Sequence, residues 1–100
     1  MSYTKETING KTTLKIEASL TIYDAPVLRE EILDCYANSR EVTVDVEEVT
    51  ECDTAGIQLL FAAGKNARKD SQSFRVIGES IAITDALKCL GLNAEEVKNG

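Results

Sequence analysis

The chain changes its hydrophobic pattern abruptly at one point, and this change constrains its fold more than any other feature. Residues 41–46 read Glu-Val-Thr-Val-Asp-Val, a period of two that is typical of a β-strand with one apolar face. From Thr54 to about Lys69, the apolar residues instead recur at the spacing of an α-helix. The run between them, residues 52–56, is therefore predicted to form a corner that leads from a strand into a helix.

This corner places a hydroxyl group, that of Thr54, at the start of the predicted helix. The first four backbone N–H groups of a helix lack intrahelical partners, and together with the helix dipole they stabilise an anion. Thr54 is therefore a candidate phosphate acceptor. Asp and Thr are also ordinary helix caps, so Asp53 can cap the helix while Thr54 stays exposed. Gly56 is interpreted first as a residue that allows close packing of the helix on the sheet.

The N-terminal part of the chain predicts a β-hairpin. Asn9-Gly10 is a strong turn signal because both residues tolerate positive φ. The following residues, 12–18, alternate between apolar and polar side chains. The apolar face of this second strand is predicted to carry Leu14, Ile16 and Ala18. Residues 19–23 are expected to connect it to the first helix.

Two further helices are predicted from their end signals. Asp24 is expected to be the N-cap of the first helix, and Ser80 that of the last one. A short strand at 73–78 precedes the last helix, which is expected to end at Gly91, where a left-handed conformation is needed. Leu92 is then expected to fold back onto that helix.

These elements give the order β-β-α-β-α-β-α in a single α/β domain. Right-handed strand–helix–strand crossovers place the parallel strands side by side. We therefore expect a four- to five-stranded mixed sheet with helices mainly on one face. The domain is expected to span residues 1–100, with a core at about 4–92 and a C-terminal tail at 93–100.

Composition argues against several classes of function. The net charge is −6 and no large basic cluster is present, which disfavours nucleic-acid binding. The chain has no histidine, so it lacks the commonest general base and metal ligand, and its three cysteines are far apart in sequence. We therefore expect no enzyme activity, no catalytic residues, no metal and no cofactor. The absence of a long apolar run predicts no membrane insertion, and the polar N-terminus predicts a cytoplasmic protein.

The motif Val-Asp-Val-x-x-Val-x-x-Cys-Asp-Thr-Ala-Gly-Ile-x-Leu-Leu, in this order of elements, resembles the STAS domain family, which includes bacterial anti-anti-sigma factors (anti-sigma factor antagonists). The resemblance implies a phosphoprotein that acts by partner switching in signal transduction and transcription regulation. The unphosphorylated form would bind a Ser/Thr kinase that is also an anti-sigma factor. Phosphorylation would release that kinase, and a phosphatase would restore binding.

Carried over by the resemblance, the phosphoacceptor is Thr54 and the acidic residue before it is Asp53. The chain departs from the family in having threonine where serine is commoner, and alanine at position 55. The residues around the corner that are expected to contact a partner are Asp53, Ala55, Gly56, Glu51 and Tyr23. For Tyr23 a half-buried packing role is the alternative. The protein is expected to be a monomer or a weak dimer.

A second function of a different class stays open. A stand-alone STAS protein of similar length, also with an Asp-Thr-x-Gly corner, serves as a cytoplasmic accessory subunit of the ABC transporter that maintains lipid asymmetry of the outer membrane. By this resemblance the chain would bind the transporter's ATPase subunit, and phosphorylation would not be essential. Small STAS proteins that work beside chemosensory systems are a variant of the first class.

Overall fold

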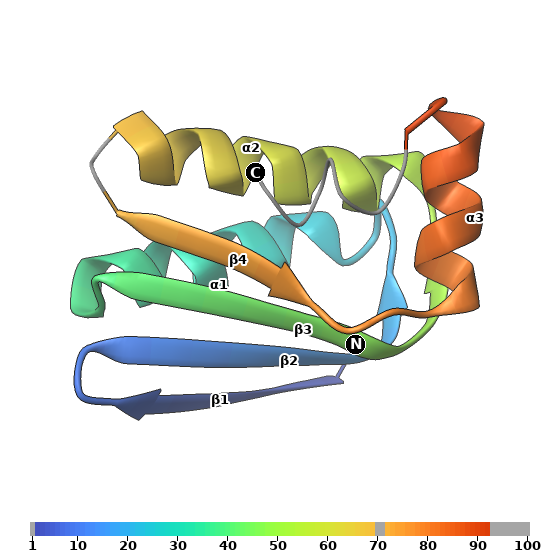
Figure 1. Ribbon diagram of the computed structural model, residues 1–100. Helices are drawn as coiled ribbons and strands as arrows, with labels where there is room; N and C mark the ends of the chain where they lie inside the picture. The colour runs from blue at the N-terminus through green and yellow to red at the C-terminus, as the bar shows by residue number, and fades with distance from the viewer. Residues whose placement is uncertain (1, 70–71, 93–100) are drawn as a thin grey trace.

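The computed structural model describes residues 2–69 and 72–92 (Figure 1). Its elements are β1 (Ser2–Ile8), β2 (Lys11–Leu20), α1 (Ala25–Asn38), β3 (Glu41–Cys52), α2 (Thr54–Lys69), β4 (Ser73–Ile77) and α3 (Ile81–Cys89). The predicted order β-β-α-β-α-β-α is therefore confirmed. The predicted tail at 93–100 lies outside the described residues.

The four strands form one mixed sheet in the order β1-β2-β3-β4. The pair β1–β2 is antiparallel, whereas β2–β3 and β3–β4 are parallel. Figure 1 shows α1 and α2 running alongside the sheet and α3 at one end of it. Alternate side chains of the strands, such as Leu14, Val44 and Val76, form one buried cluster with residues of all three helices. The apolar stripes of the helices thus cover one face of the sheet.

The β1–β2 turn has the predicted conformation. Asn9 and Gly10 have φ values of 53° and 77°, and Ile8 pairs with Lys11 across the turn. Two consecutive residues with positive φ match the right-handed twist of the strands, so this two-residue loop sets the register of the hairpin.

The end of β2 differs from the prediction. The strand continues to Leu20, and it is Leu20 rather than Ala18 that is buried. Ala18 is exposed and has a φ of 69°, because the β2–β3 register shifts on both sides of the segment 17–18. At each shift β3 has one residue more than β2, as in a β-bulge, and the regular alternation is interrupted at Ala18 and resumes with the buried Leu20. The prediction that Ala18 shares a face with Leu14 was therefore wrong, and so was the expectation that 19–23 is wholly a connection.

The extension of β2 also lengthens β3. The sequence analysis identified the strand from the alternation at residues 41–46. In the structure, β3 runs to Cys52, which pairs with Leu20. The Thr50 hydroxyl donates to the exposed Ala18 carbonyl at 3.0 Å, which compensates for part of the irregular register. The corner is thus attached directly to a paired strand.

The helix ends agree with the prediction at α3 and differ at α1. The Ser80 hydroxyl accepts from Ile83 N–H at 3.2 Å, and Gly91 has a φ of 69° where the last helix ends. Leu92 N–H donates to the Leu87 carbonyl at 2.9 Å, the expected fold-back. Asp24 occupies the position before α1, but its side chain makes no capping hydrogen bond.

The Asp24 carboxylate turns backwards instead. Its Oδ2 accepts from Thr21 N–H at 3.0 Å and from the Thr21 hydroxyl at 2.9 Å. Asp24 also has helical backbone angles, φ −92° and ψ −23°, whereas a capping residue usually has an extended conformation. Asp24 therefore stabilises the turn that precedes α1 rather than the helix itself, and the predicted capping role was wrong.

Candidate functional site

The candidate site is the corner where β3 meets α2. Thr54 is the first residue of α2 and its side chain is exposed. Ala55 is half-buried, and Glu51, at the end of β3, is exposed. The structure thus presents a hydroxyl group to solvent at the N-terminus of a sixteen-residue helix.

Asp53 connects the two sides of this corner through its two carboxylate oxygens. Oδ1 accepts from Gly56 N–H at 3.0 Å, which caps α2 as the sequence predicted. Oδ2 accepts from Ile22 N–H at 2.9 Å, in the turn that precedes α1. A backbone bond of 3.4 Å from Asp53 N–H to the Leu20 carbonyl runs beside it. The carboxylate is therefore fixed in place next to Thr54.

Gly56 is buried, and its role is packing. A Cβ atom at this position would lie 2.3 Å from the Leu20 carbonyl oxygen and 2.8 Å from Leu20 Cγ. The first turn of α2 therefore lies directly against the end of β2 because residue 56 has no side chain. This supports the packing interpretation of Gly56, and its contact with a partner stays a prediction.

The turn before α1 contributes the apolar part of the site. The Tyr23 side chain is 91% exposed, so the half-buried alternative was wrong. Ile22, on its N-terminal side, is 59% exposed, and Val27, in the first turn of α1, is 51% exposed. The sequence analysis did not select Ile22 or Val27. Val27 lies off the apolar stripe of α1 that contains Leu28 and Ile32, and this spacing could have indicated that its side chain is exposed.

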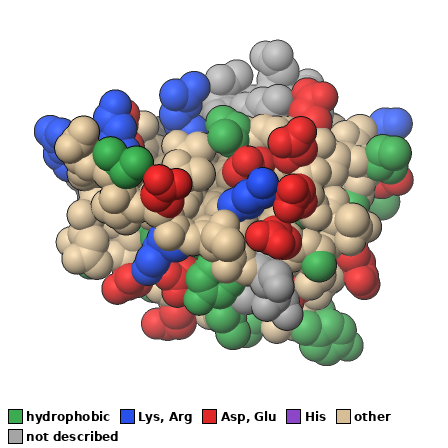
Figure 2. Space-filling model, turned by 90° about the horizontal axis from the view of Figure 1, so that it is seen from below, with side chains coloured by type: hydrophobic (Ala, Val, Ile, Leu, Met, Phe, Trp, Pro, Cys, Tyr) green, Lys and Arg blue, Asp and Glu red, His purple; other side chains and the backbone are tan. Residues whose placement is uncertain are grey.

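The strands β2 and β3, which lead toward the corner, carry several acidic side chains, among them Glu17, Asp45 and Glu48. Figure 2 shows acidic side chains gathered around a basic one on the face seen there. Lys15 pairs with Glu48 at 3.3 Å, and this hydrogen-bonded pair raises the pKa of Lys15, with smaller contributions from Asp45 and Glu17. A partner that approaches this side of the molecule meets a surface that favours basic groups.

The thiol next to the corner is not activated. Burial, with a smaller contribution from the neighbouring Asp53, raises the pKa of Cys52 to about 11. A thiol with such a pKa stays protonated at neutral pH and is a poor nucleophile. Among residues 2–69 and 72–92, no group of three or more His, Cys, Asp or Glu side chains is placed to hold a metal ion.

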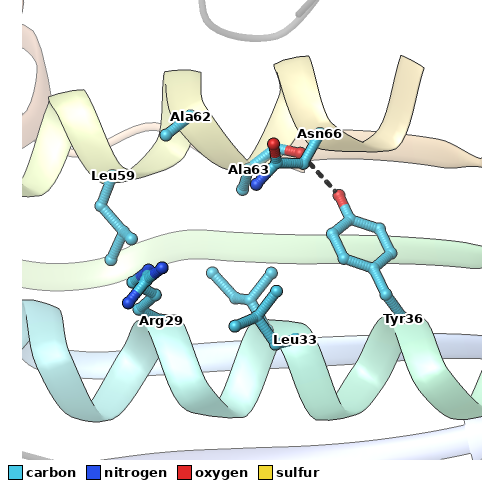
Figure 3. Close-up of a pocket in the computed structure, with 8 residues that line it drawn as sticks. Arg29, Leu33, Tyr36, Leu59, Ala62, Ala63 and Asn66 are labelled. Atoms are coloured by element: carbon cyan, nitrogen blue, oxygen red, sulfur yellow. Dashed lines mark hydrogen bonds between the residues drawn. The ribbon is translucent and has the colours of Figure 1, made fainter. Parts of the chain in front are cut away.

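A small depression of about 50 Å³ lies between α1 and α2 (Figure 3). Its walls include Arg29, Leu33, Leu59 and Asn66, and the Tyr36 hydroxyl donates across the two helices to the Ala63 carbonyl at 3.0 Å. No residue of the corner lines it. It has an apolar floor and no arrangement of groups that could perform acid–base or nucleophilic chemistry.

The family of the chain follows from the match of a family model. The model described as "Mlab, STAS domain" matches residues 5–97. This chain belongs to the STAS domain family. No curated protein sequence matches the chain significantly. No helix in the described part of this STAS domain is long and apolar enough to cross a membrane.

Solved structures share the fold of this STAS domain at low sequence identity. An anti-sigma factor antagonist from Mycobacterium paratuberculosis is 19% identical with a TM-score of 0.76, over 90% of this chain and 77% of that chain. Unphosphorylated SpoIIAA, another anti-sigma factor antagonist, is 12% identical with a TM-score of 0.75, over 91% and 82%. Phosphorylated SpoIIAA from Bacillus is 12% identical with a TM-score of 0.71, over 91% and 85%. At these identities the likeness shows the shared fold.

Proposed function

We propose that this STAS domain is a cytoplasmic regulatory binding module of the anti-sigma factor antagonist type, switched by phosphorylation of Thr54. The observation that carries the proposal is the exposed Thr54 hydroxyl at the start of α2, beside the fixed carboxylate of Asp53. Its partners are proposed to be a Ser/Thr kinase that is also an anti-sigma factor, and a phosphatase that acts on the phosphorylated form.

The position of Thr54 suits a phosphate that changes the surface and preserves the fold. A phosphate group adds roughly −1.5 to −2 charges at pH 7, and a helix N-terminus stabilises that charge. Both the unphosphorylated and the phosphorylated forms of SpoIIAA share the fold of this chain, with TM-scores of 0.75 and 0.71. The STAS fold of SpoIIAA is therefore kept in both its phosphorylated and its unphosphorylated form.

The effect on a partner follows from the charges already present. Asp53 and the exposed Glu51 precede Thr54 at the end of β3, so a phosphate would add to the negative charge of two carboxylates close in sequence. A docked partner would then experience like-charge repulsion and would have to desolvate the phosphate. An unfavourable coupling of about 3 kcal/mol weakens binding about 100-fold, so no large conformational change is needed.

The test compares the wild type with Thr54→Glu and Thr54→Ala as bait in lysate of the native host, with mass spectrometry of the captured proteins. A kinase or signalling ATPase should bind the wild type and Thr54→Ala and be lost with Thr54→Glu. Phosphate should also be found on Thr54 after incubation with ATP and the captured kinase. Capture that does not depend on the charge at residue 54 contradicts the proposal.

The second candidate is an accessory subunit that binds the ATPase of a lipid-asymmetry ABC transporter. The match of a STAS family model over residues 5–97 supports it as well, because the accessory subunit that the chain resembles is a stand-alone STAS protein of similar length. The same experiment separates the two candidates. Recovery of the ATPase and permease subunits of a transporter, from wild type and Thr54→Ala alike and without a kinase, supports the accessory subunit.

A further inference from the structure

The exposed apolar side chains of the molecule are concentrated beside the corner. Eight large hydrophobic residues are exposed among the described residues, and three of them lie within the segment 22–27. These are Ile22, Tyr23 and Val27, which we call the apolar turn patch. Exposed apolar groups that gather in one place, next to polar residues, are typical of protein-binding surfaces.

The apolar turn patch is held in a defined conformation. Asp24 N–H donates to the Thr21 carbonyl at 2.9 Å, and Tyr23 N–H donates to the Thr21 hydroxyl at 3.3 Å. The Asp24 carboxylate accepts two further bonds from Thr21, which lower its pKa in spite of burial. A surface that is already ordered loses less conformational entropy on binding, so this turn is suited to present anchor side chains.

One hydrogen bond joins this patch to the corner. Ile22 N–H donates to Oδ2 of Asp53, the residue next to Thr54, at 2.9 Å. The other oxygen of the same carboxylate caps α2 by accepting from Gly56 N–H. The side chain of Asp53 therefore sets the position of the apolar turn patch relative to Thr54.

We propose that Ile22, Tyr23 and Val27 form the apolar half of the surface that docks the partner protein, and that Asp53 positions this half beside Thr54. This inference rests on the proposed function. The occupant is the same protein that is repelled by charge at residue 54, and it presents an apolar pocket for Tyr23 with a basic rim. The basic rim is the charge complement of Glu51 and Asp53, and the pocket is the shape complement of a Tyr23 side chain that is 91% exposed and can be buried on docking.

A tyrosine at such a position supplies much of the binding energy of an interface. Its ring buries roughly 150–250 Å² and loses little rotational freedom, and tyrosine is enriched among the residues that dominate binding. The charge at residue 54 would then act at the edge of an apolar contact, where water is excluded and repulsion is weakly screened. The surface thus combines an anchor that provides affinity with a charge that controls it.

The first measurement tests the positioning role of Asp53. In Asp53→Asn only one side-chain oxygen remains, so the amide can accept from Gly56 N–H or from Ile22 N–H but not from both. Hydrogen exchange followed by NMR should show the Ile22 amide exchanging roughly ten-fold faster than in the wild type. Ser80→Ala is the matched control, because it removes the cap of α3 and leaves the turn untouched. Asp53→Ala removes both acceptor oxygens, so an Ile22 exchange rate that is unchanged in Asp53→Ala overturns the positioning role.

The second measurement tests the docking surface. The photoreactive amino acid benzoylphenylalanine replaces Tyr23 or, as a control, Ile81, which is 81% exposed on α3. After irradiation in the native host, position 23 should give an adduct with a partner protein and position 81 should not. Asp53→Asn should reduce the adduct several-fold, whereas Ser80→Ala should not. No adduct at 23, an equal adduct at 81, or an adduct between two copies of this chain overturns the docking surface.

The same experiment separates this inference from the proposed function. When Thr54→Glu is combined with benzoylphenylalanine at position 23, loss of the adduct supports both the docking surface and the phosphorylation switch. An adduct at 23 that persists with Thr54→Glu supports the docking surface and contradicts the phosphorylation switch. Release of a partner by Thr54→Glu, without any adduct at 23 in the unmodified background, supports the switch and overturns the apolar turn patch as its docking surface.

Discussion

The substitution Gly56→Ala tests the packing that builds the corner. The added Cβ atom would lie 2.3 Å from the Leu20 carbonyl oxygen, far inside van der Waals contact. Its nearest neighbour is backbone, and that backbone belongs to a strand residue paired with Cys52 of β3. The clash therefore cannot be relieved by rotation of a side chain, and α2 or the end of β2 must move.

Two effects of opposite sign determine the expected magnitude. Alanine stabilises a helix interior by about 1 kcal/mol relative to glycine. Overpacking costs typically about 1–3 kcal/mol, and a rigid backbone neighbour favours the upper end of that range. We therefore expect Gly56→Ala to lower the free energy of unfolding by about 2 kcal/mol, and the melting temperature by roughly 10 °C.

Urea unfolding followed by circular dichroism measures this difference directly. The control is Gln58→Ala, an exposed position on the same helix, whose free energy of unfolding should stay within about 0.5 kcal/mol of the wild type. The slope of the transition should be unchanged, since the same surface is exposed on unfolding. If Gly56→Ala is as stable as the wild type or more stable, helix propensity outweighs the contact, and the close approach of α2 to β2 is refuted.

Three further predictions concern titratable groups. Asp24→Ala leaves the Thr21 N–H and hydroxyl without their acceptor and should cost about 1–3 kcal/mol of unfolding free energy. Burial raises the pKa of Asp24, but hydrogen bonds from Thr21 and Ser19 together lower it from 3.8. The difference in unfolding free energy should therefore be full above pH 4 and should shrink on acidification as the folded-state carboxyl is protonated. A difference that stays constant down to pH 2 contradicts this prediction. At pH 8 a thiol reagent should label the exposed Cys89 rapidly and the buried Cys35 only on unfolding; similar rates would refute the burial of Cys35. Because burial raises the pKa of Cys52 from 9.0 to about 11, the unfolded state loses its proton first, so stability should fall between pH 9 and 11, and Cys52→Ala should reduce that fall.

The local parts of the fold were predictable because their signals are short-range. Asn9-Gly10 specifies its turn through the φ values that the two residues tolerate. The alternation at 41–46 specifies the strand, and Ser80 and Gly91 specify the two ends of α3. The positive φ of Ala18, 69°, was not predictable, because alanine does not favour this conformation. It occurs where the register between β2 and β3 shifts, and that pairing is not a local property of the sequence.

Two aspartates show how far the candidate site could be predicted. Asp24 and Asp53 both precede helices, and the sequence favoured capping for each. Only Asp53 caps, because the Asp24 carboxylate accepts from the hydroxyl and the N–H of Thr21 and makes no hydrogen bond to the first N–H groups of α1. The bond from Ile22 to Asp53 joins residues 31 positions apart, and no local pattern could reveal it.

The corner is therefore built by three features that act together: the extension of β2 to Leu20, the absence of a side chain at Gly56, and the two bonds of Asp53. The Asp53 carboxylate already occupies the Gly56 N–H, the donor that a capping anion would use. Negative charge added at Thr54 would thus lie beside a fixed carboxylate and face solvent. Under the proposed switch, such a charge would act on the protein that lies against the corner.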